Sequence, residues 1–281
     1  MELMQLNKFG DLHNGRSVIF CKTEFLKAEF KRIGKLKNEV VLISGNNDEG
    51  VDATYTRHMP DNVRTWYCQN NLTYDERLKS LPLGLENTFE NKRKGHGVGW
   101  PHAIEKIELL NELQYSGNDR APAKLLYANF NVQTNSKHRI PVRDLCEKSN
   151  FIDWEEPVLK YPEFLRTVLD YQAVLCPAGN GVDTHRIYEI LYCGRIPVTI
   201  KRGDYPLYRE IYEKLPVVML EQLSDLNDRN KIEELIDHAK RKLGQFELLD
   251  FRFWKQSILT ESGTVPKVAM TFLEKLISHF R

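Results

Sequence analysis

The sequence predicts an α/β protein built from two Rossmann-like domains that face each other across a cleft. Short apolar runs, typical of buried strands, alternate along the chain with amphipathic stretches of helical spacing. The alternation occurs twice, and a polar segment rich in turn-forming residues, Tyr115–Pro122, separates the two series. Open α/β sheets bind ligands at the carboxyl ends of their strands, so a cleft between two such domains can bring two substrates together.

The first series begins with the apolar run Ser17–Cys21, a predicted strand. Thr23–Leu36 follows it and predicts a helix, because Phe25, Leu26, Phe30 and Ile33 share one helical face. The remaining predicted elements of this series are strands at Glu39–Ser44, Val63–Cys68 and Leu81–Leu83 and a helix at Pro101–Leu113.

The second series repeats the pattern. Its predicted strands are Lys124–Phe130, Tyr171–Cys176, Ile196–Ile200 and Val217–Leu220. Its predicted helices are Tyr161–Leu169, Asp183–Cys193 and Asp204–Leu215, and further helices end the chain. We therefore expect a first domain at 1–118, a second at 119–264, and a final apolar-faced helix within 265–281.

The composition is that of a globular protein and argues against a nucleic-acid binder. Lysine and arginine number 40 against 39 aspartates and glutamates, a net charge of +1, whereas nucleic-acid binders carry a basic excess. The 5 cysteines have no CxxC spacing, which favours a reducing compartment. No run has the roughly 20 apolar residues that span a bilayer, and the N-terminus lacks a signal-peptide pattern. We expect a soluble cytoplasmic protein.

The segment Leu175–Val198 carries the strongest functional signal. A predicted strand ends at Cys176–Pro177, and the glycines of Gly179–Gly181 let the following loop turn sharply and approach a ligand closely. A helix comes next, with Asp183 or Thr184 as its expected N-cap. The free N–H groups at the start of such a helix attract anions.

Two charged side chains of this predicted helix point to a nucleotide. Arg186 falls in the first turn, where its guanidinium can bind a diphosphate with two hydrogen bonds. Glu189 lies three residues further on the same face and can accept hydrogen bonds from two ribose hydroxyls. The spacing alone also fits an ordinary strand–turn–helix with a solvated Arg–Glu pair.

The pattern P-x-G-x-G-x-D-x-x-R-x-x-E-x-L-x-x-G-x-I-P-V resembles the donor-site signature of the exostosin family of glycosyltransferases. Trp66–Asn87 and Leu125–Asn131 resemble segments of small bacterial and viral members, so that the resemblance covers much of Thr65–Arg202. It implies the two-domain GT-B architecture, a nucleotide-sugar donor, a glycan or glycoprotein acceptor and an inverting transfer. In GT-B enzymes the last helix often crosses back to the first domain; packing on the second domain is the alternative for this chain.

The resemblance also favours UDP as the nucleotide, because most of the family uses it. UDP-xylose and a capsid glycan of an algal virus, made in the host cytoplasm, are one specific pair of substrates. No DxD triplet stands on an expected strand-end loop, so we expect no metal requirement for chemistry and no cofactor besides the co-substrate. The expected donor-binding residues are Asn131, Arg139, Gly179, Asn180, Gly181, Asp183, Thr184, Arg186 and Glu189, of which Asn131 and Arg139 rest on family analogy.

Sugar transfer also needs a base that takes the proton of the acceptor hydroxyl. We expect it in the first domain, and Asp48 is the first candidate, because its loop Ser44–Gly50 directly follows a buried strand. His13 and His58 are the alternatives, and an ordinary turn role for Asp48 stays open. Arg186, with the helix start, is expected to stabilise the leaving diphosphate.

The acceptor side is expected at Trp66, Gln69 and Asn70, because sugars stack on aromatic rings and bond to amides. A tryptophan in a strand is more often a core residue. A non-catalytic module that binds a nucleotide-sugar and regulates a partner is the alternative function. An epimerase would need a G-x-G-x-x-G motif after the first strand, and the sequence after Cys21 is KTEFLK.

Overall fold

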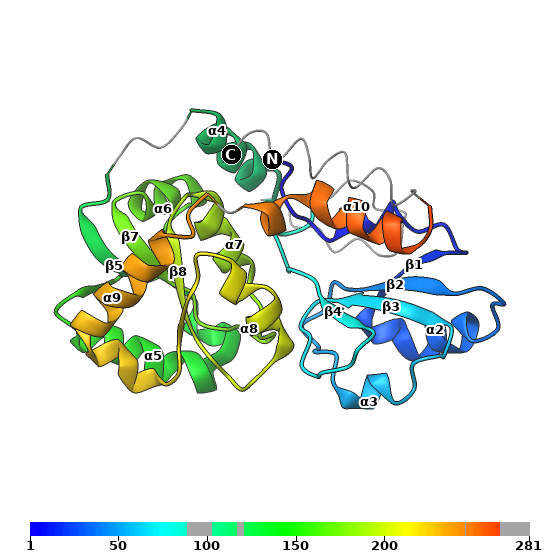
Figure 1. Ribbon diagram of the computed structural model, residues 1–281. Helices are drawn as coiled ribbons and strands as arrows, with labels where there is room; N and C mark the ends of the chain where they lie inside the picture. Colours follow the sequence, from blue (N-terminus) through cyan, green and yellow to red (C-terminus); the bar gives the residue numbers. More distant parts are fainter. Residues whose placement is uncertain (89–102, 117–120, 245, 265–281) are drawn as a thin grey trace.

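The computed structural model describes residues 1–88, 103–116, 121–244 and 246–264. Two parallel β-sheets lie side by side in it, each packed against helices (Figure 1). This confirms the predicted α/β class with two Rossmann-like domains. The boundaries at residues 118 and 264 stay predictions, and the predicted final helix within 265–281 lies outside the described residues.

The first sheet has four strands in the order β1-β2-β3-β4, all parallel. They are β1 (Val18–Lys22), β2 (Val40–Gly45), β3 (Val63–Cys68) and β4 (Leu78–Ser80). The helical elements of this half are α1 (Asn7–Gly10), η1 (Thr23–Phe25), α2 (Leu26–Ile33) and α3 (Ala53–Thr56). Strand β4 lies three residues before the predicted strand Leu81–Leu83, because Pro82 has no N–H to donate and Gly84 turns the chain at a φ of 69°.

The second sheet has five parallel strands in the order β6-β5-β7-β8-β9. They are β5 (Lys124–Ala128), β6 (Ile152–Trp154), β7 (Tyr171–Leu175), β8 (Ile196–Ile200) and β9 (Val218–Leu220). The chain goes from β5 to one neighbour, β6, and then returns to the other side for β7. The order reverses between β5 and β7, and at such a switch point the loops leave in opposite directions and open a crevice for a ligand.

Helices flank this second sheet. They are η2 (Val132–Asn135), α5 (Ser136–Lys148), α6 (Tyr161–Val168), α7 (His185–Tyr192), α8 (Pro206–Glu210), η3 (Tyr212–Lys214), η4 (Leu223–Asn227) and α9 (Arg229–Lys240). The sequence did not predict α5 or β6: α5 is largely polar and carries Pro141 inside it, and β6 has only 3 residues. Both are held by tertiary packing, since Val142, Cys146 and Ile152 are buried in the core of this domain.

One apolar core is shared by both domains. In β2, the side chains of Val41 and Ile43 pack into this shared core. The side chain of Leu42, between them, points to the other face of the sheet and packs into a smaller, separate cluster under α2. The shared core continues into the second domain through residues such as Tyr188 of α7. The two sheets are therefore packed together through buried apolar side chains as well as through polar contacts.

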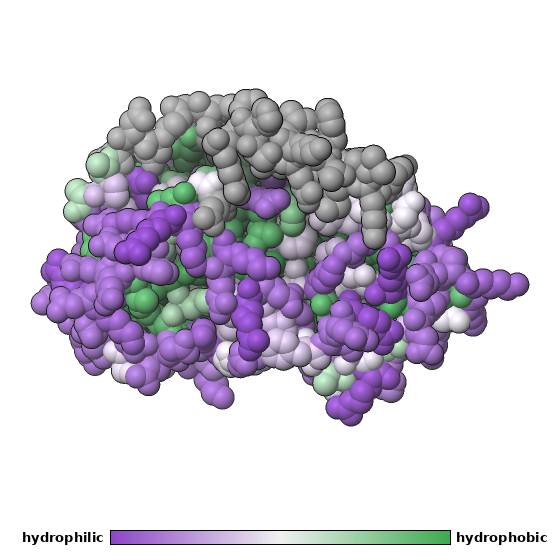
Figure 2. All heavy atoms as spheres, in the orientation of Figure 1, coloured by the Kyte–Doolittle hydropathy of each residue, from purple (hydrophilic) through white to green (hydrophobic). Residues whose placement is uncertain are grey.

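The end of the described chain returns to the first sheet. Helix α4 (Ala103–Ser116), η5 (Glu247–Leu249) and α10 (Phe251–Glu261) lie along the upper side of the molecule in Figure 1. Phe251 N donates to Glu2 O over 2.9 Å, and the ring of Trp254 lies 6.2 Å from that of Tyr67 in β3. Hydrophilic residues cover much of the outer face of both domains in Figure 2. No helix of the described part is long and apolar enough to cross a bilayer.

Candidate functional site

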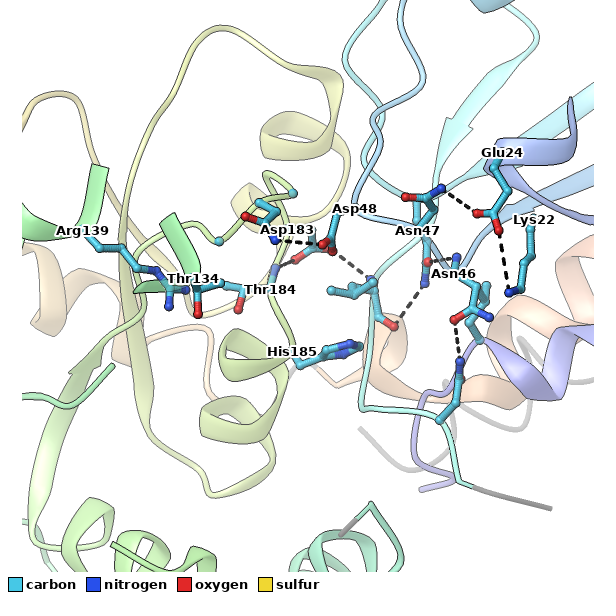
Figure 3. A pocket seen from close by; sticks show the side chains of 17 residues that line it. Lys22, Glu24, Asn46, Asn47, Asp48, Thr134, Arg139, Asp183, Thr184 and His185 are labelled. Atoms are coloured by element: carbon cyan, nitrogen blue, oxygen red, sulfur yellow. Dashed lines mark hydrogen bonds and ion pairs between the residues drawn. The ribbon is translucent and has the colours of Figure 1, made fainter. Parts of the chain in front are cut away.

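Two adjoining cavities lie between the sheets. The smaller, of about 250 Å³, lies over the carboxyl ends of β5 and β7 and is lined by Asn131 and Cys176. The larger, of about 450 Å³, extends from there to the loops after β1 and β2. Four residues line both cavities, and Figure 3 shows them facing the first domain: Thr134, Arg139, Thr184 and His185. The switch-point crevice of the second sheet thus opens into a space between the domains.

Arg139 of α5 is a buried cation without a carboxylate partner among the described residues. The residue is 8% exposed. Its guanidinium donates hydrogen bonds to the backbone oxygens of Asn131, Pro177 and Ala178 over 2.8 to 3.0 Å. Burial, and secondarily the charge of Arg186, lowers the pKa of Arg139 to about 10, so that it is still protonated at neutral pH. An anion in the cavity would compensate this charge.

Arg186 lies in the first turn of α7, as predicted. Its guanidinium stacks over the ring of Phe164 at 4.0 Å, and Nε lies 3.2 Å from Glu189 Oε2. Thr184 is the N-cap of this helix and accepts a hydrogen bond from Arg186 N over 3.4 Å, which confirms one of the two predicted caps. The smaller cavity therefore has two guanidinium groups and a helix N-terminus on its walls.

Glu189 is almost fully buried, at 2% exposure, and it lines the smaller cavity. Lys106 Nζ of α4 donates to Oε1 over 3.0 Å, and the same ammonium lies 2.7 Å from Glu86 Oε2. Oε2 of Glu189 receives no hydrogen bond, although Arg186 is near. Burial raises the pKa of Glu189, but Arg186 and Lys106 outweigh burial and hold it below its ordinary value. Glu189 is therefore a charged carboxylate at the cavity wall, and its buried Oε2 accepts no hydrogen bond.

The structure gives Asp183 a different role from donor binding. Its Oδ1 accepts from Thr184 N and Tyr212 Oη over 2.8 and 2.6 Å, and its Oδ2 accepts from Leu83 N and Tyr188 Oη over 2.9 and 2.6 Å. Both oxygens are thus fully engaged, one of them by the first domain. Burial raises the pKa of Asp183 even though these hydrogen bonds oppose the change. The prediction that this carboxylate contacts a donor is wrong, because no acceptor is left.

The glycine-rich loop after β7 lies between the domains. A Cβ on Gly181 would meet the side-chain amide of Asn70 at 3.0 Å, which is too close for ordinary packing. Gly179 O accepts from Asn135 Nδ2 over 2.6 Å, and Gly179, Asn180 and Gly181 all line the larger cavity. Asn131 lines the smaller one, where its Oδ1 caps the following turn by accepting from Gln133 N.

The three residues expected on the acceptor side are committed elsewhere. Trp66 is 0% exposed and donates to Ser44 Oγ over 2.8 Å, so its assignment to an acceptor surface is wrong. Asn70, 2% exposed, accepts from Asp183 N over 2.9 Å and links the domains instead of facing an open space. Gln69 lines the larger cavity, but its amide bonds the backbone of Asn46 and Leu83.

Of the three predicted base candidates, Asp48 alone lines one of these two cavities. Its Oδ2 accepts a hydrogen bond from Asn180 Nδ2 over 3.1 Å. His13 is exposed and accepts from Phe20 N over 3.0 Å, and exposed His58 follows α3; neither lines these cavities. The first-domain wall also has Lys22, whose Nζ lies 3.8 Å from Glu24 Oε1.

Sequence reasoning missed several residues of this site, among them His185, Lys106, Glu86 and Thr134. His185 stands inside the glycine-rich motif, and its ring nitrogen Nδ1 lies 2.7 Å from Gly84 O of the first domain. Lys106 and Glu86 have no local signal, because Lys106 reaches Glu189, and Glu86 reaches Lys106, only through the tertiary fold. Within the described ranges, no three His, Cys, Asp or Glu side chains are grouped as metal ligands would be.

Comparison with known proteins gives a weak structural likeness. No protein-family model and no curated protein sequence matches the chain. The pneumococcal O-GlcNAc transferase GtfA, solved with UDP and GlcNAc, superposes with a TM-score of 0.41 at 8% identity, over 90% of this chain and 58% of GtfA. TarM gives 0.38 at 11% identity, over 91% of this chain and 56% of TarM. The chain spans less than two thirds of either protein. The candidate site is therefore defined by the geometry of this chain alone.

Proposed function

We propose that this protein is a glycosyltransferase. A nucleotide-sugar, with UDP as the expected nucleotide, binds in the smaller cavity, and its sugar is transferred to an acceptor hydroxyl in the larger one. The single observation that carries the proposal is Arg139, a buried guanidinium at the switch-point crevice that no carboxylate of the described residues neutralises. A diphosphate supplies the missing charge and matches the guanidinium geometry.

The other groups of the smaller cavity fit the rest of a nucleotide. The helix start at Thr184 and the second guanidinium, Arg186, add positive potential beside Arg139. The carboxylate of Glu189 at the cavity wall is suited to ribose hydroxyls, which are hydrogen-bond donors, and its buried Oε2 accepts no other hydrogen bond. One cavity therefore combines an anion site with an acceptor of hydroxyl hydrogens, as a nucleoside diphosphate requires.

The same charges serve the reaction. As the bond between the sugar and the diphosphate breaks, negative charge grows on the leaving phosphate, and fixed positive groups stabilise it. Arg139 and Arg186 supply that charge, so we propose that chemistry proceeds without a divalent metal. The sequence resemblance adds two further parts to this proposal. The transfer inverts the anomeric centre, and the donor is one used by exostosin-like enzymes, with UDP-xylose as the first to test.

The test is calorimetric titration of the purified protein with UDP, GDP and CMP and with their sugar derivatives, first with EDTA and then with manganese. Micromolar binding of one nucleotide class in EDTA, followed by release of that nucleotide from its sugar derivative, supports the proposal. Binding without turnover of any donor would favour a regulatory nucleotide-sugar-binding module. A folded protein that binds none of these ligands in either condition would rule out the donor site.

A further inference from the structure

His185 lies where the two cavities meet. It is the first residue of α7, between the loop after β7 and Arg186, and it lines both cavities. In Figure 3 it lies between the second-domain residues Thr134, Arg139 and Thr184 and the first-domain residues. A catalytic group in a sugar transfer must lie close to both the donor and the acceptor. His185 meets this condition, because it borders both cavities.

The hydrogen bond to the first domain determines the state of the imidazole. Nδ1 lies 2.7 Å from Gly84 O, and a carbonyl oxygen only accepts, so Nδ1 carries the hydrogen. In the neutral ring Nε2 then has a lone pair and no hydrogen. No described residue hydrogen-bonds Nε2. The hydrogen bond to Gly84 O thus fixes both the tautomer and the orientation of the ring.

The vacant nitrogen needs a hydrogen-bond donor as its partner. Phosphate oxygens are acceptors, so a neutral Nε2 does not suit the diphosphate that we place beside Arg139. A hydroxyl suits it, because an O–H donates and can give up its proton. The predicted base, Asp48, lines the larger cavity only, whereas His185 lines both. This position favours the imidazole over the carboxylate as the base.

We propose that His185 is the general base of the transfer, an inference that rests on the proposed function. Nε2 takes the proton of the acceptor hydroxyl, and the electron pair of that O–H bond stays on oxygen. The oxygen attacks the anomeric carbon and forms the new C–O bond, while the bond from this carbon to the diphosphate breaks and its electron pair leaves with the nucleotide. The proton on the imidazolium passes to solvent after the product leaves.

Charged groups of both domains surround this ring. In the larger cavity they are Lys22, Glu24 and Asp48 from the first domain and Asp183 from the loop before α7. In the smaller cavity they are Glu86, Lys106 of α4, Arg139 of α5, and Arg186 and Glu189 of α7 itself. Because acidic and basic side chains both line these cavities, the pH dependence of the reaction rate can be assigned to His185 only by comparing variants.

Release of UDP from UDP-xylose, UDP-glucose and UDP-N-acetylglucosamine tests the assignment, because water can stand in for the unidentified acceptor. Rates are measured from pH 5 to 9 for the full chain, for His185→Gln, for Asp48→Asn and for His58→Gln as an exposed-histidine control. We expect His185→Gln to lower kcat by at least about a hundredfold and to abolish the fall in rate toward acid pH. KM and the calorimetric Kd for UDP should change less than about threefold.

His185→Ala adds a readout that a structural role would not give. Added imidazoles should restore UDP release, with rates that rise with the basicity of the imidazole. The assignment would be overturned if the fall in rate toward acid pH disappeared in Asp48→Asn and persisted in His185→Gln. A His185→Ala protein that binds UDP but gains no rate from any imidazole would also overturn it. If the unmodified protein neither binds UDP nor releases it, the proposed function fails first, and the two failures are thereby distinguished.

Discussion

Asn180 of the second domain donates a hydrogen bond from Nδ2 to Oδ2 of Asp48 in the first, over 3.1 Å. Both residues line the larger cavity, and their hydrogen bond joins the loop after β7 to the loop after β2. It therefore brings the residue predicted as base next to the motif predicted to bind the donor. The contact is exposed and single, so it is worth about 0.5 to 1.5 kcal/mol at most.

Asp48→Asn tests whether this contact or proton transfer is the role of Asp48. With His185 as the base, we expect UDP release to fall by less than about tenfold, the equivalent of one such hydrogen bond. Asn180→Ala removes this bond outright, whereas the amide oxygen in Asp48→Asn can still accept it, so Asn180→Ala should lower the rate by at least as much as Asp48→Asn. Turnover that disappears in Asp48→Asn but survives in Asn180→Ala, with UDP binding intact in both, would place the base at Asp48.

Asp183→Ala should destabilise the protein strongly. It leaves the buried hydroxyls of Tyr188 and Tyr212 and the partly buried N–H of Leu83 without an acceptor. Each unsatisfied group costs about 1 to 3 kcal/mol, so we expect the free energy of unfolding in urea to fall by about 3 kcal/mol or more. The exposed Asp237→Ala on α9 is the matched control and should change it by about 0.5 kcal/mol or less. Equal stability of the two variants would contradict the domain-linking role of Asp183.

Arg186→Ala and Glu189→Ala should each lower transfer activity by at least about a hundredfold, as expected for losing a charge-stabilising or a donor-orienting group. The two losses should differ in kind. Arg186→Ala should weaken UDP binding as well as turnover, whereas Glu189→Ala should weaken UDP and uridine equally, since both have the ribose. A variant that retains nearly full activity would remove its residue from the donor site.

The low pKa of Glu189 predicts a pH dependence of stability. Arg186 and Lys106 outweigh burial and hold the folded carboxyl below its ordinary pKa. As the pH falls, the unfolded chain therefore takes up this proton before the folded protein does, and the stability that Glu189 contributes is lost. Above the ordinary carboxyl range the contribution is complete. Glu189→Gln should be less stable than the unmodified protein at pH 7, and denaturation midpoints should converge toward pH 3. A constant difference would contradict the shift.

Local features of the sequence predicted much of the fold. Apolar runs located β1, β2, β3, β5, β7, β8 and β9, and Thr184 was one of two expected helix caps, because these signals depend on neighbouring residues. Strand β6 and helix α5 had no such signal. Pro141 and the polar surface of α5 argue against a helix, and only packing of Val142 and Cys146 against the second sheet makes it form. Family analogy pointed to Arg139, but its burial follows from that packing alone.

The site was predicted less completely than the fold, because its contacts join distant segments. Asp183 receives hydrogen bonds from Leu83 and Tyr212, and no local pattern shows that both would reach it. Trp66 was a candidate for the acceptor side with a core position as the alternative, and it packs edge-on against Phe30 within the core. Lys106 is separated from Glu189 by 83 positions in the chain. Such partners become visible only when the two sheets are packed together.

The most direct test of the central claim is calorimetric titration with UDP of the unmodified protein, Arg139→Met and Arg143→Met. Both arginines lie on α5, but Arg143 pairs with Asp144, outside the cavities. A charge-assisted hydrogen bond is worth about 1.5 to 3 kcal/mol, so we predict that Arg139→Met weakens UDP binding by roughly 10- to 150-fold. Arg143→Met should leave the affinity unchanged. Equal UDP affinity in all three proteins would contradict a diphosphate site at Arg139.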